Sequence, residues 1–561
     1  MKSLVIFLMA LSLVGFVSAG ELEGDFGCSV KDPDCADGIV DLCDVRSSLT
    51  LEKGEYYMNN GIDICVSDIV LDCNGAKFIG NGFESAGIDI NSQFNVEVKN
   101  CIIEGYGKGI LMEKTGGAVI RSNDLGFNNY GLFLDNSNSL HPDFPYQLLD
   151  NEMNNNSIHG AYIIEGNSGT ISGNTANYNY FSGIYIDNSD GIDITNNEVR
   201  YNINDLVPPP YPNWDKNGGI YLIDSSDINI ENNLLGRNIY NGIVLMDTDR
   251  TEIIGNDLSY NGFHGVLMRD SDDSGIIKNN ISHNSNVYYN TFALGLGIRM
   301  EDSKGNAVES NDLSNNWERG VLLDNSDNNV IEGNNLDYNW GSGIILAEGS
   351  DYNSIIGNSL SHERNFVGIG LAESSYNLIS GNTANWNKIS GISLSDSSNY
   401  NIVEGNTAQY NKQNATGYIQ NGWGLNVINS QYNSVSGNDF SFNYMDGIRL
   451  KSGSRNNNII SNIIKNNEKS GVFADEASSY NSLSSNIIKN NLNGISLKNS
   501  NSMSINKNNV CGNINLDFNL QSSNGNTGDN NRCNNPGTWN DNGSQGCSFV
   551  CLSNGNTGGR L

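Results

Sequence analysis

A glycine followed by an apolar residue recurs along most of this chain, usually at a step of 22 to 25 residues. A fixed period of this size predicts a solenoid, in which each repeat stacks on its neighbours. Four steps are longer and contain insertions: 131–160, 183–219, 265–297 and 391–424. The repeat glycines are Gly87, Gly109, Gly131, Gly160, Gly183, Gly219, Gly242, Gly265, Gly297, Gly320, Gly343, Gly368, Gly391, Gly424, Gly447, Gly471 and Gly494.

The pattern within one repeat identifies the secondary structure. In GIYIDNSDGIDITNNEVRYN (183–202), apolar and polar residues alternate around Ile184, Ile186, Ile192 and Ile194. Alternation with β-branched residues predicts short strands, and no stretch has a helical period long enough for one helix per repeat. We therefore predict an all-β, single-stranded parallel β-helix. About 18 coils at a rise of about 4.8 Å give a rod roughly 85 Å long.

Asparagine occupies one fixed place in the repeat, at Asn174, Asn256, Asn279, Asn311, Asn334, Asn358, Asn382, Asn406, Asn438, Asn462 and Asn486. Stacked amides can hydrogen-bond from coil to coil. These residues are expected to help form the core, because the hydrophobic share of the chain is only 37%.

The ends of the chain differ from its middle. Residues 1–19 have a lysine, an apolar run and Val17-Ser18-Ala19, which predicts a secretory signal peptide. Of ten cysteines, six lie between positions 28 and 101 and four between 511 and 551. Disulfides are typical of an extracellular or periplasm-like space. We expect a Cys-rich N-terminal cap with the first coil at 20–86, repeats at 87–515 and a Cys-rich C-terminal cap at 516–561. The pairing within each cluster stays open.

The formal net charge of −32 disfavours nucleic acid as a partner. No second apolar run follows the signal peptide, so the mature chain is expected to have no membrane span. We expect a secreted or periplasm-like protein, and we expect it to be a monomer.

The segment DIVLDCNGAKFIG (68–80) and the GI-x-L…S…N-x-I…GN units resemble the NosD-like, carbohydrate-binding and sugar-hydrolase (CASH) group. The resemblance covers about 60–520. It implies a right-handed, pectin-lyase-like β-helix and polysaccharide binding or processing. Its NosD members imply a role in copper-enzyme maturation, but copper requires clustered His, Met or free Cys. Four of the five histidines, His141, His159, His283 and His362, are expected in turns.

One outward column of side chains is unusually aromatic. Two residues after the repeat glycine, the column reads Phe133, Tyr162, Tyr185, Tyr221, Val244, Leu267, Arg299, Leu322 and Ile345. Exposed apolar stripes often mark binding sites, and aromatic rings suit the C–H faces of sugars. A stripe covered by loops is the alternative.

Insertions are expected along the same edge of the rod. Three of them, 203–216, 285–296 and 412–423, precede the outward strand, whereas 140–147 follows its strand. Tryptophans also precede repeat glycines here, at Trp214, Trp317, Trp340, Trp386 and Trp423. We predict a polysaccharide-binding groove between these loops and the aromatic column; the alternative is that the tryptophans only seal the corner.

Carboxylates recur near the strand end, at Asp135, Glu165, Asp187, Asp224, Asp247, Asp270, Asp302, Asp324, Glu348, Glu373 and Asp396. Calcium could bridge such a column, because it takes oxygen ligands in flexible geometry. No EF-hand loop or GGxGxDxUx repeat is present, so a solvated row of turns is the other interpretation.

Candidate catalytic residues gather on coils 264–324. We expect His264, Arg269, Arg299, Glu301 and Asp324 on one face, together with Arg319 as a binding residue. Glu301 and Asp324 would lie one coil apart, about 5 Å, which suits a retaining glycosidase pair. The arginines could bind a uronate carboxylate, or an Arg or His could abstract a proton in a lyase. Salt-bridged coils without chemistry are the alternative.

A second resemblance argues against a known pectin hydrolase. His264-Gly265 followed by Arg299 is similar in spacing to the His-Gly and Arg-Ile-Lys elements of polygalacturonases. Where that family has Asp on the two preceding coils, this chain has Asn217-Gly218 and Asn241-Gly242, and Met300 replaces the Lys. Non-catalytic polysaccharide binding is therefore the preferred hypothesis. A lyase, hydrolase or epimerase, a copper accessory protein and a purely structural surface protein remain as alternatives.

Overall fold

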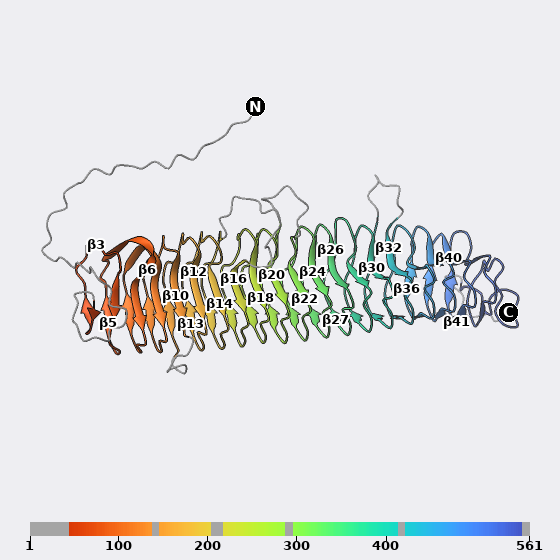
Figure 1. Ribbon diagram of the computed structural model, residues 1–561. Coiled ribbons are helices and arrows are strands. Elements are labelled where there is room, and N and C mark those ends of the chain that lie inside the picture. The colour runs from red at the N-terminus through yellow and green to blue at the C-terminus, as the bar shows by residue number, and fades with distance from the viewer. Residues whose placement is uncertain (1–43, 137–144, 203–216, 286–294, 413–420, 553–561) are drawn as a thin grey trace, which may run out of the picture.

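The computed structural model describes residues 44–136, 145–202, 217–285, 295–412 and 421–552, and these form a straight rod of stacked coils (Figure 1). The described residues contain strands and turns but no helix, and hence no helix that could cross a bilayer. The predicted parallel β-helix is confirmed. Trp214, His141 and the signal peptide lie outside the described residues.

The first sheet runs the length of the rod and contains the Gly-Ile-x-Leu strands. Its neighbours are parallel and in register, so that Tyr185 pairs with Tyr221. Its strands are β1 (Asp44–Val45), β3 (Glu55–Tyr57), β4 (Ile62–Ile64), β6 (Lys77–Asn91), β8 (Ile102–Glu113), β10 (Tyr130–Asp135), β12 (His159–Ile164), β14 (Ile184–Asp187), β16 (Gly218–Ile223), β18 (Asn241–Met246), β20 (Val266–Arg269), β22 (Ile298–Glu301), β24 (Arg319–Asp324), β26 (Ser342–Ala347), β28 (Ile369–Ala372), β30 (Ser390–Ser395), β32 (Trp423–Ile428), β34 (Ile448–Lys451), β37 (Ser470–Ala474), β40 (Asn493–Lys498) and β43 (Phe518–Gln521).

The second sheet follows the first after a turn in every coil. Its strands are β2 (Leu49–Thr50), β5 (Val70–Asp72), β7 (Glu97–Lys99), β9 (Val119–Arg121), β11 (Gln147–Leu149), β13 (Thr170–Ser172), β15 (Asp193–Thr195), β17 (Asn229–Glu231), β19 (Glu252–Ile254), β21 (Gly275–Ile277), β23 (Ala307–Glu309), β25 (Val330–Glu332), β27 (Ser354–Ile356), β29 (Leu378–Ser380), β31 (Ile402–Glu404), β33 (Ser434–Ser436), β35 (Asn458–Ile460), β38 (Ser482–Ser484), β41 (Ser504–Asn506) and β44 (Thr527–Asp529). A third row consists of single parallel bridges and ends as β36 (Ile463–Lys465), β39 (Ile487–Lys489) and β42 (Asn509–Cys511).

The interior of the coils is one continuous apolar core, in which Ile184, Ile186 and Ile194 are fully buried. The repeat glycine marks a place where neighbouring coils approach too closely for a side chain. At Gly265, a Cβ atom would lie 2.1 Å from Ile281 Cγ2 and 2.8 Å from the backbone oxygen of Gly297. The repeat therefore requires glycine for packing.

Two ladders of buried asparagines run along most of the rod, and a third runs from Asn306 to Asn481. Asn174 is typical: its Oδ1 accepts hydrogen bonds from the backbone N–H (2.9 Å) and the amide (3.0 Å) of Asn151. Its own Nδ2 donates to Leu148 O (2.8 Å) and to Asn197 Oδ1 (3.0 Å). The side-chain amide is thus fully hydrogen-bonded, and the predicted asparagine stacking is confirmed.

The two long ladders each end at an aspartate near the C-terminus. Asn531 donates from its backbone N–H and its amide to the Asp541 carboxylate, at 2.9 and 2.6 Å. In the second ladder, the Asn513 amide donates to Asp517 Oδ1 at 2.8 Å. A carboxylate accepts without donating, so it satisfies the last amide donors of each ladder.

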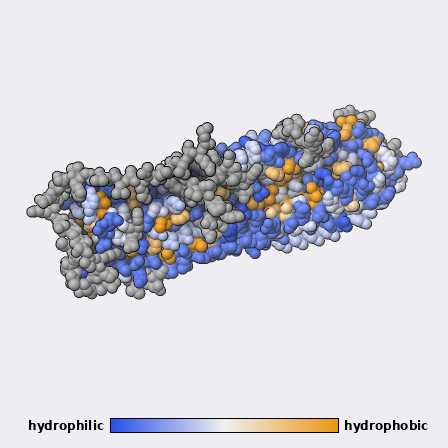
Figure 2. Space-filling view, turned by 45° about the horizontal axis from the view of Figure 1, so that its top comes forward, coloured by the Kyte–Doolittle hydropathy of each residue, from blue (hydrophilic) through white to orange (hydrophobic). Residues whose placement is uncertain are grey.

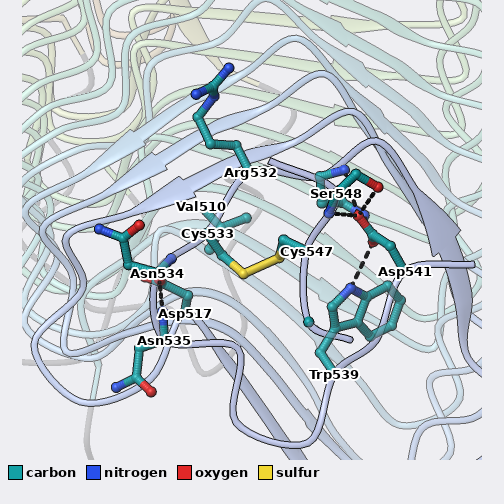
Figure 3. The surroundings of a disulfide bond; sticks show 12 residues. Val510, Asp517, Arg532, Cys533, Asn534, Asn535, Trp539, Asp541, Cys547 and Ser548 are labelled. Carbon is teal, nitrogen blue, oxygen red and sulfur yellow. Dashed lines mark hydrogen bonds between the residues drawn. A yellow bond between two sulfur atoms is a disulfide. The ribbon is translucent and has the colours of Figure 1, made fainter. Parts of the chain in front are cut away.

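A disulfide-linked segment closes this end of the rod. Figure 3 shows the Cys533–Cys547 disulfide beside Asp541, which also accepts hydrogen bonds from Trp539 Nε1 (2.9 Å) and Ser548 Oγ (2.8 Å). The Trp539 ring stacks on Phe518, covering the core. A second disulfide joins Cys511 to Cys551, and Cys73–Cys101 joins two coils near the N-terminal end. Disulfides thus lie towards both ends, as predicted.

Glu363 interrupts the second asparagine ladder. Its backbone N–H donates to Asn387 Oδ1 (2.9 Å), as an asparagine would, but its side chain places a carboxyl group in the core at 1% exposure. Burial, together with the nearby Asp337 carboxylate, raises the pKa of Glu363 well above its ordinary range. Burial therefore favours the neutral acid over the carboxylate in the folded protein.

We predict that Glu363→Asn stabilises the protein at neutral pH by roughly 1–3 kcal/mol, the cost of an ill-matched buried polar group. Because the raised pKa means that the folded state holds the Glu363 proton more tightly than the unfolded state does, Glu363 stabilises the wild type most at pH values below the ordinary pKa of Glu. That contribution is lost as the pH rises through the folded-state pKa of Glu363. The variant should lose this pH dependence in thermal unfolding.

Glu404→Asn serves as the control, because Glu404 is exposed on β31. If Glu363→Asn and Glu404→Asn change the melting temperature equally at every pH, the buried carboxyl group has no such role.

Candidate functional site

The outward column of the first sheet has the predicted composition. Strand pairing aligns Phe133, Tyr162, Tyr185, Tyr221, Val244, Leu267, Arg299, Leu322 and Ile345 in one register. The column then continues through Gly370, Ser393, Asn426, Arg449, Phe473 and Ser496. It therefore changes from aromatic at the N-terminal end to polar at the C-terminal end.

The four aromatic residues form one stack. The centroids of Phe133 and Tyr162 are 5.1 Å apart, those of Tyr162 and Tyr185 are 4.8 Å apart, and those of Tyr185 and Tyr221 are 5.0 Å apart. Because carbon atoms pack at about 3.5–4.0 Å, the rings are offset and overlap only in part. Phe133, Tyr162 and Tyr185 are half-buried, so each still offers part of its ring to solvent.

The next part of the column is covered. Tyr221 is 6% exposed, and Val244 and Leu267 are fully buried in a small cluster with Met246 on the outer side of the sheet. The aromatic surface available to a ligand is consequently shorter than the sequence suggests, because it ends at Tyr185.

His159 joins this aromatic surface, although the sequence placed it in a turn. It is the first residue of β12, and its ring lies 5.5 Å from Tyr162 and 5.1 Å from Tyr185. Its Nδ1 accepts the Ser182 N–H at 3.1 Å, and burial lowers the pKa of His159 to about 4. The expectation for His159 was wrong, whereas His283 and His362 do occupy turns with left-handed backbones.

The charged candidates lie together on coils 269–324. Glu301 accepts a hydrogen bond from Arg269 Nε at 2.6 Å and forms an ion pair with Arg299. Arg299 also contacts Asp324 at 3.3 Å, and Asp324 pairs in register with Glu301. The four side chains are 13–31% exposed and form a chain of alternating charge. Both arginines therefore already have carboxylate partners.

Asp324 is the candidate acid of this cluster. Burial raises its pKa, Arg299 opposes that shift, and the neighbouring Glu348 and Glu301 raise the pKa further. A carboxyl group that keeps its proton more readily can donate it to a ligand. The geometry thus supplies an acid beside a carboxylate, as a glycosidase pair requires, but both groups are bound to Arg299.

His264 does not reach the surface with them. It is fully buried, its Nδ1 accepts the Leu296 N–H at 3.4 Å, and burial lowers its pKa to about 3. A neutral, buried imidazole is not accessible to a polymer on the outer face.

The tryptophans lie at more than one place. Trp317 and Trp340 stack at 5.1 Å on the corner before the first sheet and are 49% and 42% exposed. Trp423 is 6% exposed at the start of β32, and Trp386 lies in a different turn row. Arg319 pairs with Glu318 at 3.1 Å. In Figure 2, hydrophobic patches interrupt an otherwise hydrophilic surface.

Two exposed aromatic ladders on the turns were missed by sequence reasoning. Tyrosines precede buried asparagines at a regular step, and this Tyr-Asn repeat was the available signal. One ladder contains Tyr352, Tyr376, Tyr400 and Tyr432, and the other contains Tyr338, His362, Trp386, Tyr410 and Phe442.

The carboxylates form two rows instead of the one predicted. Asp135, Asp187 and Asp324 end strands of the first sheet, whereas Glu165, Asp224 and most of the others occupy the next residue, with positive φ. The described residues contain no group of three or more His, Cys, Asp or Glu side chains that could hold a metal ion.

A cavity of about 520 Å³ lies elsewhere, between the second sheet and the row of bridges near the N-terminal end. Its lining includes Asp124, Asp150 and Glu152 but no outward residue of the first sheet. It is therefore separate from the charged cluster.

Comparison with protein families gives two matches. The family model described as "Right handed beta helix region" matches residues 182–360 and 414–533, more than half of the chain. The model described as "Periplasmic copper-binding protein (NosD)" matches residues 48–208. A search of curated proteins finds no match.

Solved structures with related coils include the A-module of mannuronan C-5 epimerase AlgE4 from Azotobacter vinelandii, which is 18% identical. The match covers 58% of this chain and 87% of that chain, with a TM-score of 0.37. PfbA, a surface adhesin of Streptococcus pneumoniae, is 12% identical over 73% of this chain and 86% of that chain, with a TM-score of 0.27. At these scores, neither likeness carries an argument about activity.

The described residues that match the NosD model do not form a copper ligand set. Copper binds His, Met or thiolate side chains. His159 is buried among aromatic rings, and Cys73 and Cys101 are joined in a disulfide. Met58 and Met112 are buried in the core. We therefore assign no step to copper.

We predict that Arg299→Ala raises the pKa of Asp324, because Arg299 is the main group that opposes the effect of burial. Arg319→Ala should do the same to a smaller extent, since Arg319 contributes least among the groups that act on Asp324. The pKa can be followed by NMR on protein with ¹³C-labelled aspartate carboxyl groups. An unchanged Asp324 titration in Arg299→Ala would show that the ion pair does not control this carboxyl group.

Proposed function

We propose that this chain, which belongs to the family of proteins with a right-handed β-helix region, binds polysaccharide along the outer face of its first sheet. The observation that carries the proposal is the stack of half-exposed rings at Phe133, Tyr162 and Tyr185. A polysaccharide is a repeating ligand, and the rod offers it an equivalent position on every coil. Trp317 and Trp340 form a separate exposed aromatic pair on the corner beside that sheet, several coils further along the rod.

The location of the protein fits this proposal. The signal peptide predicted at 1–19 and the disulfides at Cys73 and Cys511 suit an extracellular or periplasmic protein. A formal net charge of −32 disfavours nucleic acid. We propose a monomer that binds an extracellular or cell-surface polysaccharide.

Binding without catalysis is the better-supported form of the function. The charges of Arg269 and Arg299 are paired with Glu301 and Asp324, and His264 is buried. A lyase, hydrolase or epimerase remains the second candidate, because the pKa of Asp324 is raised and Glu301 lies on the neighbouring coil. Calcium, if it takes part, would act through carboxylates on the turns.

The proposal predicts that the wild type retains one or more members of a panel of neutral and acidic polysaccharides, measured with and without calcium. The double variant Tyr162→Ala/Tyr185→Ala should bind about tenfold more weakly, which corresponds to about 1.4 kcal/mol. Tyr376→Ala is the matched control, because Tyr376 belongs to a ladder on the turns. Failure of the wild type to bind any polysaccharide, or equal losses in both variants, would contradict the proposal.

The same samples separate binding from catalysis. Reducing ends and the absorbance of unsaturated products are measured after incubation. Binding without products supports a binding protein. Products that disappear in Glu301→Gln, Asp324→Asn and Arg299→Ala would establish the enzyme instead, and products that persist in all three would place the chemistry elsewhere.

A further inference from the structure

We propose a second ligand site on the outer face of the first sheet, near its C-terminal end, where Arg449 receives the carboxylate of a sugar acid. Hydroxyl groups of the same ligand bind Trp423, Asn426 and Asp446, which surround Arg449. The proposal rests on the proposed function only in taking a sugar as the ligand, because its residues are separate from the aromatic stack.

Arg449 differs from the arginines of the charged cluster. It lies on β34 in the outward column, is half-buried, and its guanidinium lies 4.4 Å from the centre of the Trp423 ring. Within the described residues it forms no ion pair and donates no hydrogen bond, whereas Arg269, Arg299 and Arg319 are all paired. Burial lowers the pKa of Arg449, although Asp446 and Glu476 oppose the shift. A partly desolvated cation of this kind favours an anionic partner.

Two buried polar atoms beside Arg449 also make no hydrogen bond of good geometry within the described residues. Asn426 pairs with Arg449 across the strands and is 4% exposed, and its Oδ1 accepts no hydrogen bond. Trp423 Nε1 is likewise buried and makes no hydrogen bond of good geometry, but it lies near enough to Asp446 to lower the pKa of that carboxyl group. Buried polar atoms are normally satisfied by protein, water or ligand. Asn426 Oδ1 is therefore an acceptor available to a hydroxylated ligand, and Trp423 Nε1 is a donor that the ligand would share with Asp446.

Asp446 supplies a second acceptor. It stands directly before the repeat Gly447, is 5% exposed, and accepts the Ser470 N–H at 2.8 Å. Burial raises the pKa of Asp446 to about 6, against the effects of the Ser470 N–H and of Arg449. At neutral pH the carboxylate form predominates, so Asp446 can accept a hydrogen bond from a hydroxyl group.

The combination favours a sugar acid over the alternatives. A planar guanidinium matches a carboxylate with two parallel hydrogen bonds. A neutral sugar would bring Arg449 no anionic group, and a phosphate dianion would place more negative charge beside the Asp446 carboxylate than a monocarboxylate does. A hexuronate, free or as a unit of an acidic polysaccharide, satisfies both the charged and the neutral groups.

The test uses the full-length protein and titration calorimetry with glucuronate and a diuronate, compared with glucose and glucose 6-phosphate. The wild type should bind at least one uronate at least tenfold more tightly than glucose. Arg449→Ala should lose at least tenfold in uronate affinity. Arg455→Ala, an equal change of charge at an exposed position in the next turn, should bind as the wild type does.

Several results would overturn the inference. These are no binding of either uronate to the wild type, equal affinity for glucose and uronate, tighter binding of glucose 6-phosphate, or unchanged affinity in Arg449→Ala. If Arg449→Ala does not fold, judged by circular dichroism, Arg449→Lys decides, because it keeps the charge but loses the two-pronged contact; unchanged affinity in that variant also overturns the site.

The same assay separates this inference from the proposed function. Tyr162→Ala/Tyr185→Ala should retain uronate binding if the second site exists. If the double variant loses polysaccharide binding while Arg449→Ala keeps the uronate affinity of the wild type, the proposed function stands and this second site is ruled out.

Discussion

The interaction on which the rest of this structure depends is the hydrogen bond from one asparagine side chain to the asparagine one coil away. A ladder amide such as Asn174 accepts two hydrogen bonds and donates at least two. Interior polarity therefore carries little cost where the ladder is complete, whereas Asn156 Nδ2 and the Glu363 carboxyl group are buried without a hydrogen bond of good geometry among the described residues. The bonds also fix the register of one coil on the next, which apolar packing alone would specify less strictly.

A fixed register has a direct effect on the outer surface. Side chains at equivalent places fall into columns, so that a residue chosen in one coil always meets the same place in its neighbours. Aromatic residues become stacks, as at Tyr162 and Tyr185, and charges become ion pairs, as at Glu301 and Arg299. Departures from the repeat are then conspicuous. Glu363 in an asparagine ladder and Arg449 without a carboxylate partner are two such departures.

The repeat itself could be derived from the sequence, because the regular spacing of the glycines and asparagines indicates which residues of neighbouring coils lie next to one another. The columns of the first sheet followed from the same spacing. The environment of each charged residue could not be derived. Arg299 and Arg449 both stand two residues after a repeat glycine, yet Arg299 lies between Glu301 and Asp324, whereas Arg449 lies over the Trp423 ring. Burial and pairing depend on side chains one coil above and below, and on neighbours from the corner, which a period does not specify.

The asparagine ladders have a direction. The backbone N–H of each ladder asparagine donates to the side-chain oxygen of the asparagine in the next, C-terminal coil, so asparagine coils are interchangeable as hydrogen-bonding units. Only the last coil has donors left over, and Asp517 and Asp541 accept them. Whole coils can therefore be gained or lost from the middle without new terminal chemistry. The length of the rod is free to change over evolutionary time, while its C-terminal end must be conserved as a unit.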